Sequence, residues 1–179
     1  ISPAHREKLT KHTQATIRAR ATKLFGKVDP NRTKVIASYA GVAKLKGNVE
    51  DGAFLFKANC AACHRFKNGG NPVGPDLATL ASKPLADWLI GILDPNRAVE
   101  DKYVGYVIIT RDDTAHTGVI TAETPTSLTL RTAIGQEQII LRANIKTLQS
   151  TGLSLMPPGL EAALPPPAMA DLLAYLRGQ

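Results

Sequence analysis

The sequence predicts a mainly helical fold that is interrupted by a small antiparallel β-sheet. Apolar residues recur with the period of an α-helix in several segments before residue 94 and again after residue 164. Between about residues 103 and 149 the period changes to two, and Val, Ile and Thr become frequent. Because helical segments flank these strands on both sides, we expect the sheet to be an insertion within a helical unit.

The length and composition are those of a globular chain. With 179 residues the chain can close a hydrophobic core without disulfides, so its size does not explain its two cysteines. No apolar run approaches the roughly 18 residues that cross a bilayer. The sequence opens at Ile1 with a polar segment, so we expect that any export signal has been removed or lies upstream.

The positive charge is concentrated in the first quarter of the chain. Residues 1–46 carry 11 Lys and Arg against two acidic residues, Glu7 and Asp29, whereas the remainder carries 11 against 13. A basic segment of this kind can bind nucleic acid or an anionic membrane surface. No nucleic-acid motif accompanies it, so a solvated helix face is the favoured interpretation.

Two helices are expected in this basic segment, over residues 10–25 and 33–47. In the first, the apolar residues form one stripe, and Gly47 ends the second. Two isolated helices bury little surface. Residues 1–47 are therefore predicted to be an N-terminal helical extension, the end of a preceding helical region, and residues 48–179 a second domain.

The next helix leads to the cysteines. Asn48 can cap a helix that starts at Val49 and delivers Cys60. Residues 66–77 are rich in Gly, Pro and Asn and are expected to form a loop. A further helix is predicted over residues 85–93, where the sequence DPN ends it.

About five short strands are predicted for residues 103–149, with polar turns between them. A second loop, residues 154–160, leads to a C-terminal helix over residues 164–178, whose prolines suit a helix start. Three leucines should form the buried stripe of this helix: Leu172, Leu173 and Leu176.

The two cysteines lie in the sequence NCAACHRF, where Cys60 and Cys63 are followed directly by His64. The C-x-x-C-H spacing is the signature of c-type haem attachment, in which each thiol forms a thioether with a vinyl group and the histidine is the proximal iron ligand. About one helical turn separates the thiols, which matches the separation of the two vinyl-bearing edges. The motif therefore predicts one covalent haem.

Other roles for the cysteines need residues that the sequence does not supply. A structural zinc site needs four ligands, and His5 and His12 lie far upstream of the motif. An iron–sulfur cluster normally needs four cysteines. A thioredoxin-type dithiol would follow a strand, whereas a helical segment precedes this motif. A dithiol or a simple disulfide is the remaining alternative.

The sixth coordination position of the iron has few candidates: Met156, Met169, His5, His12, His116, a lysine or water. Met169 lies in the predicted C-terminal helix, where core packing is the ordinary explanation. Met156 lies in a proline-flanked loop, an unfavourable place for a flexible apolar residue unless something binds it. A thioether sulfur is a soft ligand that suits haem iron, so Met156 is favoured.

Four further residues have two interpretations each. Trp88 can contact a haem propionate, but a core tryptophan is favoured. Arg97 and Lys102 can neutralise a propionate or be solvated charges. His116 begins a predicted strand and is expected to be a surface residue.

At CAACH, GPDL and SLMPPGL the chain resembles class I cytochromes c. These proteins have a helix that enters the motif, a proline loop on the histidine side, a methionine loop and a closing C-terminal helix. The resemblance implies that the carbonyl of Pro75 accepts the Nδ1 proton of His64. It also implies that Leu77 lines the haem pocket.

The resemblance is closer to one branch. The segments GPDLATLASK, ILDPNRAVEDKY, SLMPPGLE and MADLLAYL are similar to the haem-binding domain appended to large exported dehydrogenase-like proteins of planctomycete and verrucomicrobial bacteria. The similarity covers about residues 48–178, including the strand-rich stretch. It implies a class I cytochrome c-like helical fold around covalent haem, with a β insertion at about 103–149 and two N-terminal helices. It also implies that the chain is part of a longer protein.

The function predicted from these features is periplasmic one-electron transfer, without catalysis by this domain itself. Closure of both axial positions by His64 and Met156 leaves no open site on the iron. The expected electron donor is a fused or associated dehydrogenase, and the acceptor is another cytochrome or an oxidase. The alternatives are a haem-based sensor with a labile sixth ligand, and a docking module in which the sheet and the basic helices bind a partner.

Overall fold

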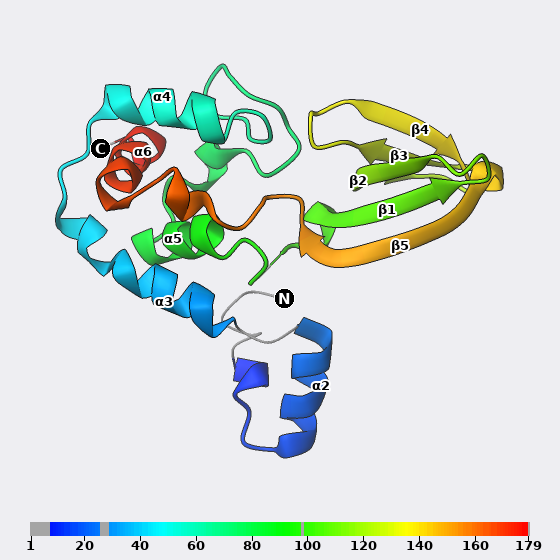
Figure 1. The fold of residues 1–179 in the computed structure, drawn as a ribbon, viewed down its shortest axis with the longest axis horizontal. Helices are drawn as coiled ribbons and strands as arrows, with labels where there is room; N and C mark the ends of the chain where they lie inside the picture. Colours follow the sequence, from blue (N-terminus) through cyan, green and yellow to red (C-terminus); the bar gives the residue numbers. More distant parts are fainter. Residues whose placement is uncertain (1–7, 26–28, 98, 179) are drawn as a thin grey trace.

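The computed structural model describes residues 8–25, 29–97 and 99–178, and it shows a group of helices beside a five-stranded sheet (Figure 1). The helices are α2 (Ala15–Phe25), α3 (Pro30–Ser38), α4 (Val49–Asn59), α5 (Leu85–Leu93) and α6 (Pro166–Arg177). The strands are β1 (Val104–Thr110), β2 (Ala115–Glu123), β3 (Ser127–Arg131), β4 (Glu137–Leu141) and β5 (Ile145–Ser154). Helices and an inserted antiparallel sheet are present as predicted, but the sheet is too large a part for the fold to be called mainly helical.

Helices α4 and α6 pack against each other and form the centre of the helical part. Helix α4 begins as predicted, because the side chain of Asn48 accepts hydrogen bonds from the amides of Glu50 and Asp51. The two helices approach closely at Gly52, where a Cβ atom would lie 2.0 Å from the backbone oxygen of Asp171. Only a glycine permits this crossing.

The helical part has its own hydrophobic core. Helices α4, α5 and α6 supply most of its buried members, and α3 adds the partly buried Val35 and Ile36. The three leucines of α6 predicted to be buried are 0–4% exposed. Phe56 of α4 stacks at an angle against Phe66, with ring centroids 5.8 Å apart. This core anchors the chain on both sides of the cysteine motif.

The predicted helix over residues 33–47 is broken at Tyr39, which has non-helical dihedral angles. Helix α3 ends at Ser38, and a short 3₁₀ helix, η1 (Ala40–Lys44), follows. The break lets Tyr39 turn into the core, where its hydroxyl donates a hydrogen bond to the carbonyl of Leu164 at 2.7 Å. The proposed domain limit at residue 47 stays a prediction, although α3 and η1 pack on the helices that follow it.

The sheet is antiparallel throughout, with the strand order β4-β3-β2-β1-β5. A second, separate cluster of buried side chains lies on one of its faces: Ile108, Leu128, Leu130 and Ile140. Strand β5 runs to Ser154, so the strands extend about five residues beyond the predicted limit of 149. The residues of this edge strand between Ile145 and Ser154 are all exposed, so no alternation of apolar and polar residues marks its end.

No helix in the described part of the chain is long and apolar enough to cross a membrane.

We expect Gly52→Ala to destabilise the haem-loaded protein by about 1–3 kcal/mol, because α4 and α6 must separate to admit the methyl group. Urea unfolding monitored by circular dichroism measures this change. Gly41→Ala is the matched control, because no atom lies within 4 Å of the added methyl group. Equal stability of the two variants would show that the close crossing does not constrain position 52.

Candidate functional site

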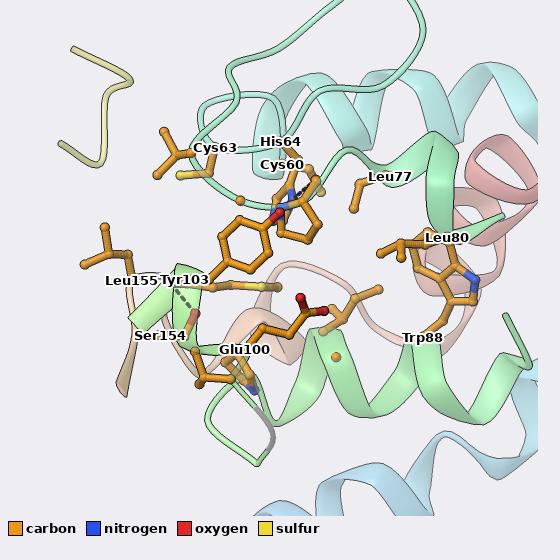
Figure 2. A pocket seen from close by; sticks show the side chains of 18 of the residues that line it. Cys60, Cys63, His64, Leu77, Leu80, Trp88, Glu100, Tyr103, Ser154 and Leu155 are labelled. Atoms are coloured by element: carbon orange, nitrogen blue, oxygen red, sulfur yellow. Dashed lines mark hydrogen bonds between the residues drawn. The ribbon is translucent and has the colours of Figure 1, made fainter. Parts of the chain in front are cut away.

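The cysteine motif occupies the turn that follows α4. The amide of Cys60 donates to the carbonyl of Phe56, and the amides of Cys63 and His64 donate to the carbonyl of Cys60. The chain therefore continues to coil for one more turn after the helix ends at Asn59. This turn brings both thiols and the imidazole to the same cavity (Figure 2).

All six residues predicted for the site line this one cavity: Cys60, Cys63, His64, Pro75, Leu77 and Met156. They come from three separate stretches of the chain, the cysteine turn, the loop after it and the segment after β5. Most of the other lining side chains are apolar, including Leu80, Trp88 and Ile92. The lining thus combines few polar groups with a largely hydrophobic wall, as in sites for large planar cofactors.

The imidazole of His64 is held by the loop after the motif. Its Nδ1 atom donates a hydrogen bond to the carbonyl of Pro75 over 2.9 Å, because a carbonyl oxygen can only accept. The neighbouring Gly74 lies flat against the ring, and a Cβ atom there would be 2.5 Å from Cε1 of His64. The ring is therefore fixed with its Nε2 atom as the free acceptor.

The backbone of the motif fixes the same loop. The carbonyl of Cys63 accepts hydrogen bonds from the amides of Val73 and Gly74, at 3.0 and 2.7 Å. Val73 is buried and lines the cavity. Hydrogen bonds thus join the turn that carries the two thiols and the loop that follows it into one unit.

Met156 lies two residues after the end of β5. Its amide donates to the hydroxyl of Ser154 at 3.0 Å, and the amide of Ser154 donates to the side chain of Asn96 at 2.9 Å. Asn96 belongs to the DPN sequence that ends α5, so the segments before and after the sheet are tied together. This tie brings Met156 to the cavity from a position 92 residues after His64.

Among the other candidates, Met169, His12 and His116 do not line the cavity, whereas one lysine, Lys83, does. Met169 is 0% exposed within the helical core. The Nδ1 atom of His116 lies 2.9 Å from the side-chain oxygen of Gln138, within the sheet. Nδ1 of His12 accepts a hydrogen bond from the amide of Gln14. His5 lies outside the described residues.

Of the residues with two interpretations, Trp88 lines the cavity, whereas Arg97 and Lys102 do not. Trp88 is 5% exposed and lines the cavity, and its Nε1 atom is buried without a hydrogen-bond partner among the described residues. Figure 2 shows this nitrogen on the side of the ring away from the cysteines. Arg97 and Lys102 are not among the lining residues, and Lys102 pairs with Glu100 at 3.5 Å.

Burial determines the protonation of the three groups of the motif. It raises the pKa of Cys60 to about 11, with a smaller contribution from the nearby Cys63, and it also raises the pKa of Cys63. Burial lowers the pKa of His64 and outweighs the opposing effect of the hydrogen bond to Pro75. At neutral pH the site therefore presents two thiols and a neutral imidazole.

This donor set fits a haem better than a metal ion held by protein ligands alone. A structural zinc site needs four protein ligands, whereas the motif supplies two cysteines and one histidine. Among the described residues, no three His, Cys, Asp or Glu side chains gather to hold a metal ion. Thiols at the edge of an apolar cavity and an imidazole held against Gly74 suit a covalently attached porphyrin, with Cys60 and Cys63 as its anchors.

The sheet contributes cavity residues that sequence reasoning missed. Val119 of β2 lines the cavity and is 2% exposed, and Tyr103 and Leu155 line it from the two ends of the inserted segment. Figure 2 shows Ser154 across the cavity from the cysteines. Nothing in the sequence distinguishes Val119 from the other apolar strand residues, because its role depends on how the sheet docks.

Comparison with known proteins identifies one part of the chain. Residues 49–108 match the family model described as "Cytochrome c". A protein named "Cytochrome c" from Arabidopsis thaliana is 53% identical over 34 residues, which cover 18% of this chain and 30% of that protein. The chain thus spans less than a third of this relative's length. The match of residues 49–108 supports haem-based electron transfer in general, and the cofactor is a c-type haem attached through Cys60 and Cys63.

Proposed function

We propose that the chain is a periplasmic electron-transfer domain whose haem iron is bound by His64 and Met156. The observation that carries this proposal is that both side chains line the same cavity as the two cysteines. No other methionine or described histidine lines it. When bound, the haem supplies a one-electron couple between ferric and ferrous iron.

The residues around His64 favour this role. The hydrogen bond to Pro75 holds the ring in one tautomer and increases its basicity as a ligand. The absence of a side chain at Gly74 lets the loop lie against the ring in this orientation. A fixed ligand keeps the same geometry in both oxidation states, which favours rapid electron transfer.

The surroundings of Met156 favour ligation as well. Its side chain is partly buried at the cavity, and its backbone is held by Ser154. A sulfur ligand in an apolar cavity favours the ferrous state and raises the reduction potential. Two protein ligands leave no position for a substrate on the iron, so the domain passes electrons and does not catalyse a reaction itself.

The location and partners follow from the attachment chemistry and from the similarity to one branch of bacterial proteins. Thioether formation needs reduced thiols and an export pathway, which is consistent with the periplasm. The similarity of ILDPNRAVEDKY and SLMPPGLE to domains appended to dehydrogenase-like proteins supports a fused or associated dehydrogenase as the donor. Another cytochrome or an oxidase is the proposed acceptor.

We expect the pigment of the mature protein to resist extraction with acidified acetone, because two thioether bonds hold it. Mass spectrometry of the denatured chain should show the mass of one haem added. In the Cys60→Ala, Cys63→Ala double variant the extraction should remove all pigment. Free release from the unaltered protein would contradict covalent attachment.

We expect Met156→Ala to lose the weak long-wavelength absorption band that sulfur ligation gives to ferric haem. Met169→Leu is the matched control, because it removes the other sulfur but conserves volume in the core, at a cost below about 1.5 kcal/mol. Visible absorption spectra of the oxidised proteins measure the band. Loss of the band in Met169→Leu with retention in Met156→Ala would reverse the assignment.

Carbon monoxide distinguishes electron transfer from sensing. The reduced protein should bind carbon monoxide slowly at neutral pH, because Met156 must leave first, whereas reduced Met156→Ala should bind it rapidly. Stopped-flow mixing measures both rates. Rapid binding by the unaltered protein would favour a haem-based sensor with a labile sixth ligand.

A further inference from the structure

The inserted sheet closes one side of the cavity. The strand register aligns Gly105, Val119, Arg131 and Glu137 in one row across β1 to β4. Residues paired across strands project from the same face of a sheet. Val119 of this row lines the cavity, so this end of the sheet faces the cysteine turn.

The turn between β3 and β4 lies against the cysteine motif. The thiol of Cys63 is 3.5 Å from the carbonyl of Ala133. Gly135 has a positive φ angle and lies beside Asn71, whose Cβ atom would be 3.2 Å from a Cβ atom on the glycine. Asn71 in turn donates through its side chain to the carbonyl of Ala62, between the two cysteines.

Arg131 joins the sheet to the loop that follows the motif. Its Nη1 atom donates to the carbonyl of Pro72 at 2.6 Å. Its Nε and Nη2 atoms donate to one carboxylate oxygen of Glu137, at 3.2 and 2.5 Å. The side chain of Arg131 is only 24% exposed, and the planar shape of its guanidinium allows it to hold both partners at once.

The loop that Arg131 holds is the one that fixes His64. Pro72 precedes Val73 and Gly74, whose amides donate to the carbonyl of Cys63. The next residue, Pro75, accepts the hydrogen bond from the imidazole. The carbonyl that Arg131 binds, that of Pro72, is therefore only three residues before the carbonyl of Pro75, which orients His64.

We propose that Arg131, held by Glu137, is a positioning residue that locks the inserted sheet onto residues 71–75 and keeps water out of the cavity on the Cys63 side. It thereby keeps the reduction potential of the domain high, because water in the cavity stabilises the more highly charged ferric state. This proposal rests on the covalent haem and on electron transfer as the function, but not on Met156 as the ligand.

The test compares the haem-loaded protein with Arg131→Gln and Arg142→Gln. Arg142 is a matched control, because it also bridges a carboxylate, Glu123 at 2.6 Å, and a backbone carbonyl, that of Thr124 at 2.9 Å. These three residues do not line the cavity. Redox titration gives the potential, and hydrogen exchange by NMR of the ferrous protein gives the protection of the Val73 and Gly74 amides.

Arg131→Gln should lower the potential and accelerate exchange of both amides, whereas Arg142→Gln should change neither. Arg131→Lys retains the charge but cannot hold both partners in the same geometry, so it should also lower the potential and accelerate exchange. Arg131→Lys supplies the same two readings if Arg131→Gln does not mature.

An unchanged potential in Arg131→Gln would overturn the proposal. If Arg131→Lys has the same reduction potential as the unaltered protein, only the positive charge at position 131 matters. This result would overturn the proposal as well. The long-wavelength sulfur band, recorded on the same samples, reports Met156 ligation separately. A failure of that assignment is thus distinguishable from a failure of the Arg131 proposal.

Discussion

The hydrogen-bonded turn after α4 is the constraint on which the site depends. The amides of this turn donate hydrogen bonds to the carbonyls of Phe56 and Cys60. Two thiols and one imidazole from five consecutive residues therefore reach the same cavity. The loop over residues 71–75 then closes on this turn through the carbonyls of Ala61 and Cys63. Because the thiols and the proximal histidine share one rigid unit, the anchors of the porphyrin and the donor to its metal keep a constant relation.

Close backbone approach recurs at the places where this unit meets the rest of the protein. Gly52 lets α4 cross α6, and Gly74 lets the proximal loop lie flat on His64. In both places a side chain would collide with atoms that cannot move without disturbing the site. The packing of the helical core and the shape of the cavity therefore require glycine at these two positions.

The sequence was most informative where a local pattern has one physical meaning. The cap at Asn48, the helix Leu85–Leu93, the buried leucines of α6 and the alternating strands were all predicted, because each depends on residues close in the chain. The motif C-x-x-C-H likewise predicted the cofactor. The break at Tyr39 was missed, because it depends on a hydrogen bond to Leu164, 125 residues away.

The contribution of the sheet to the site lay beyond sequence reasoning for the same reason. The pattern of β2 marks Val119 as apolar, but only the register and the docking of the β3–β4 turn bring it to the cavity. Arg131 is one of 22 basic residues, and nothing near it in the chain indicates that its partner is the carbonyl of Pro72. Contacts between distant segments carry no local pattern.

The chain enters and leaves the sheet at one narrow neck. Val104, where the sheet begins, pairs directly with Ser154, where it ends, and Ser154 is bonded to Asn96. The two connections to the helical part thus leave from adjacent points, and Met156 is placed by the neck rather than by the strands beyond it. The ends of the strands that lie away from the cavity and from residues 71–75 can therefore change in length without moving the histidine or the methionine.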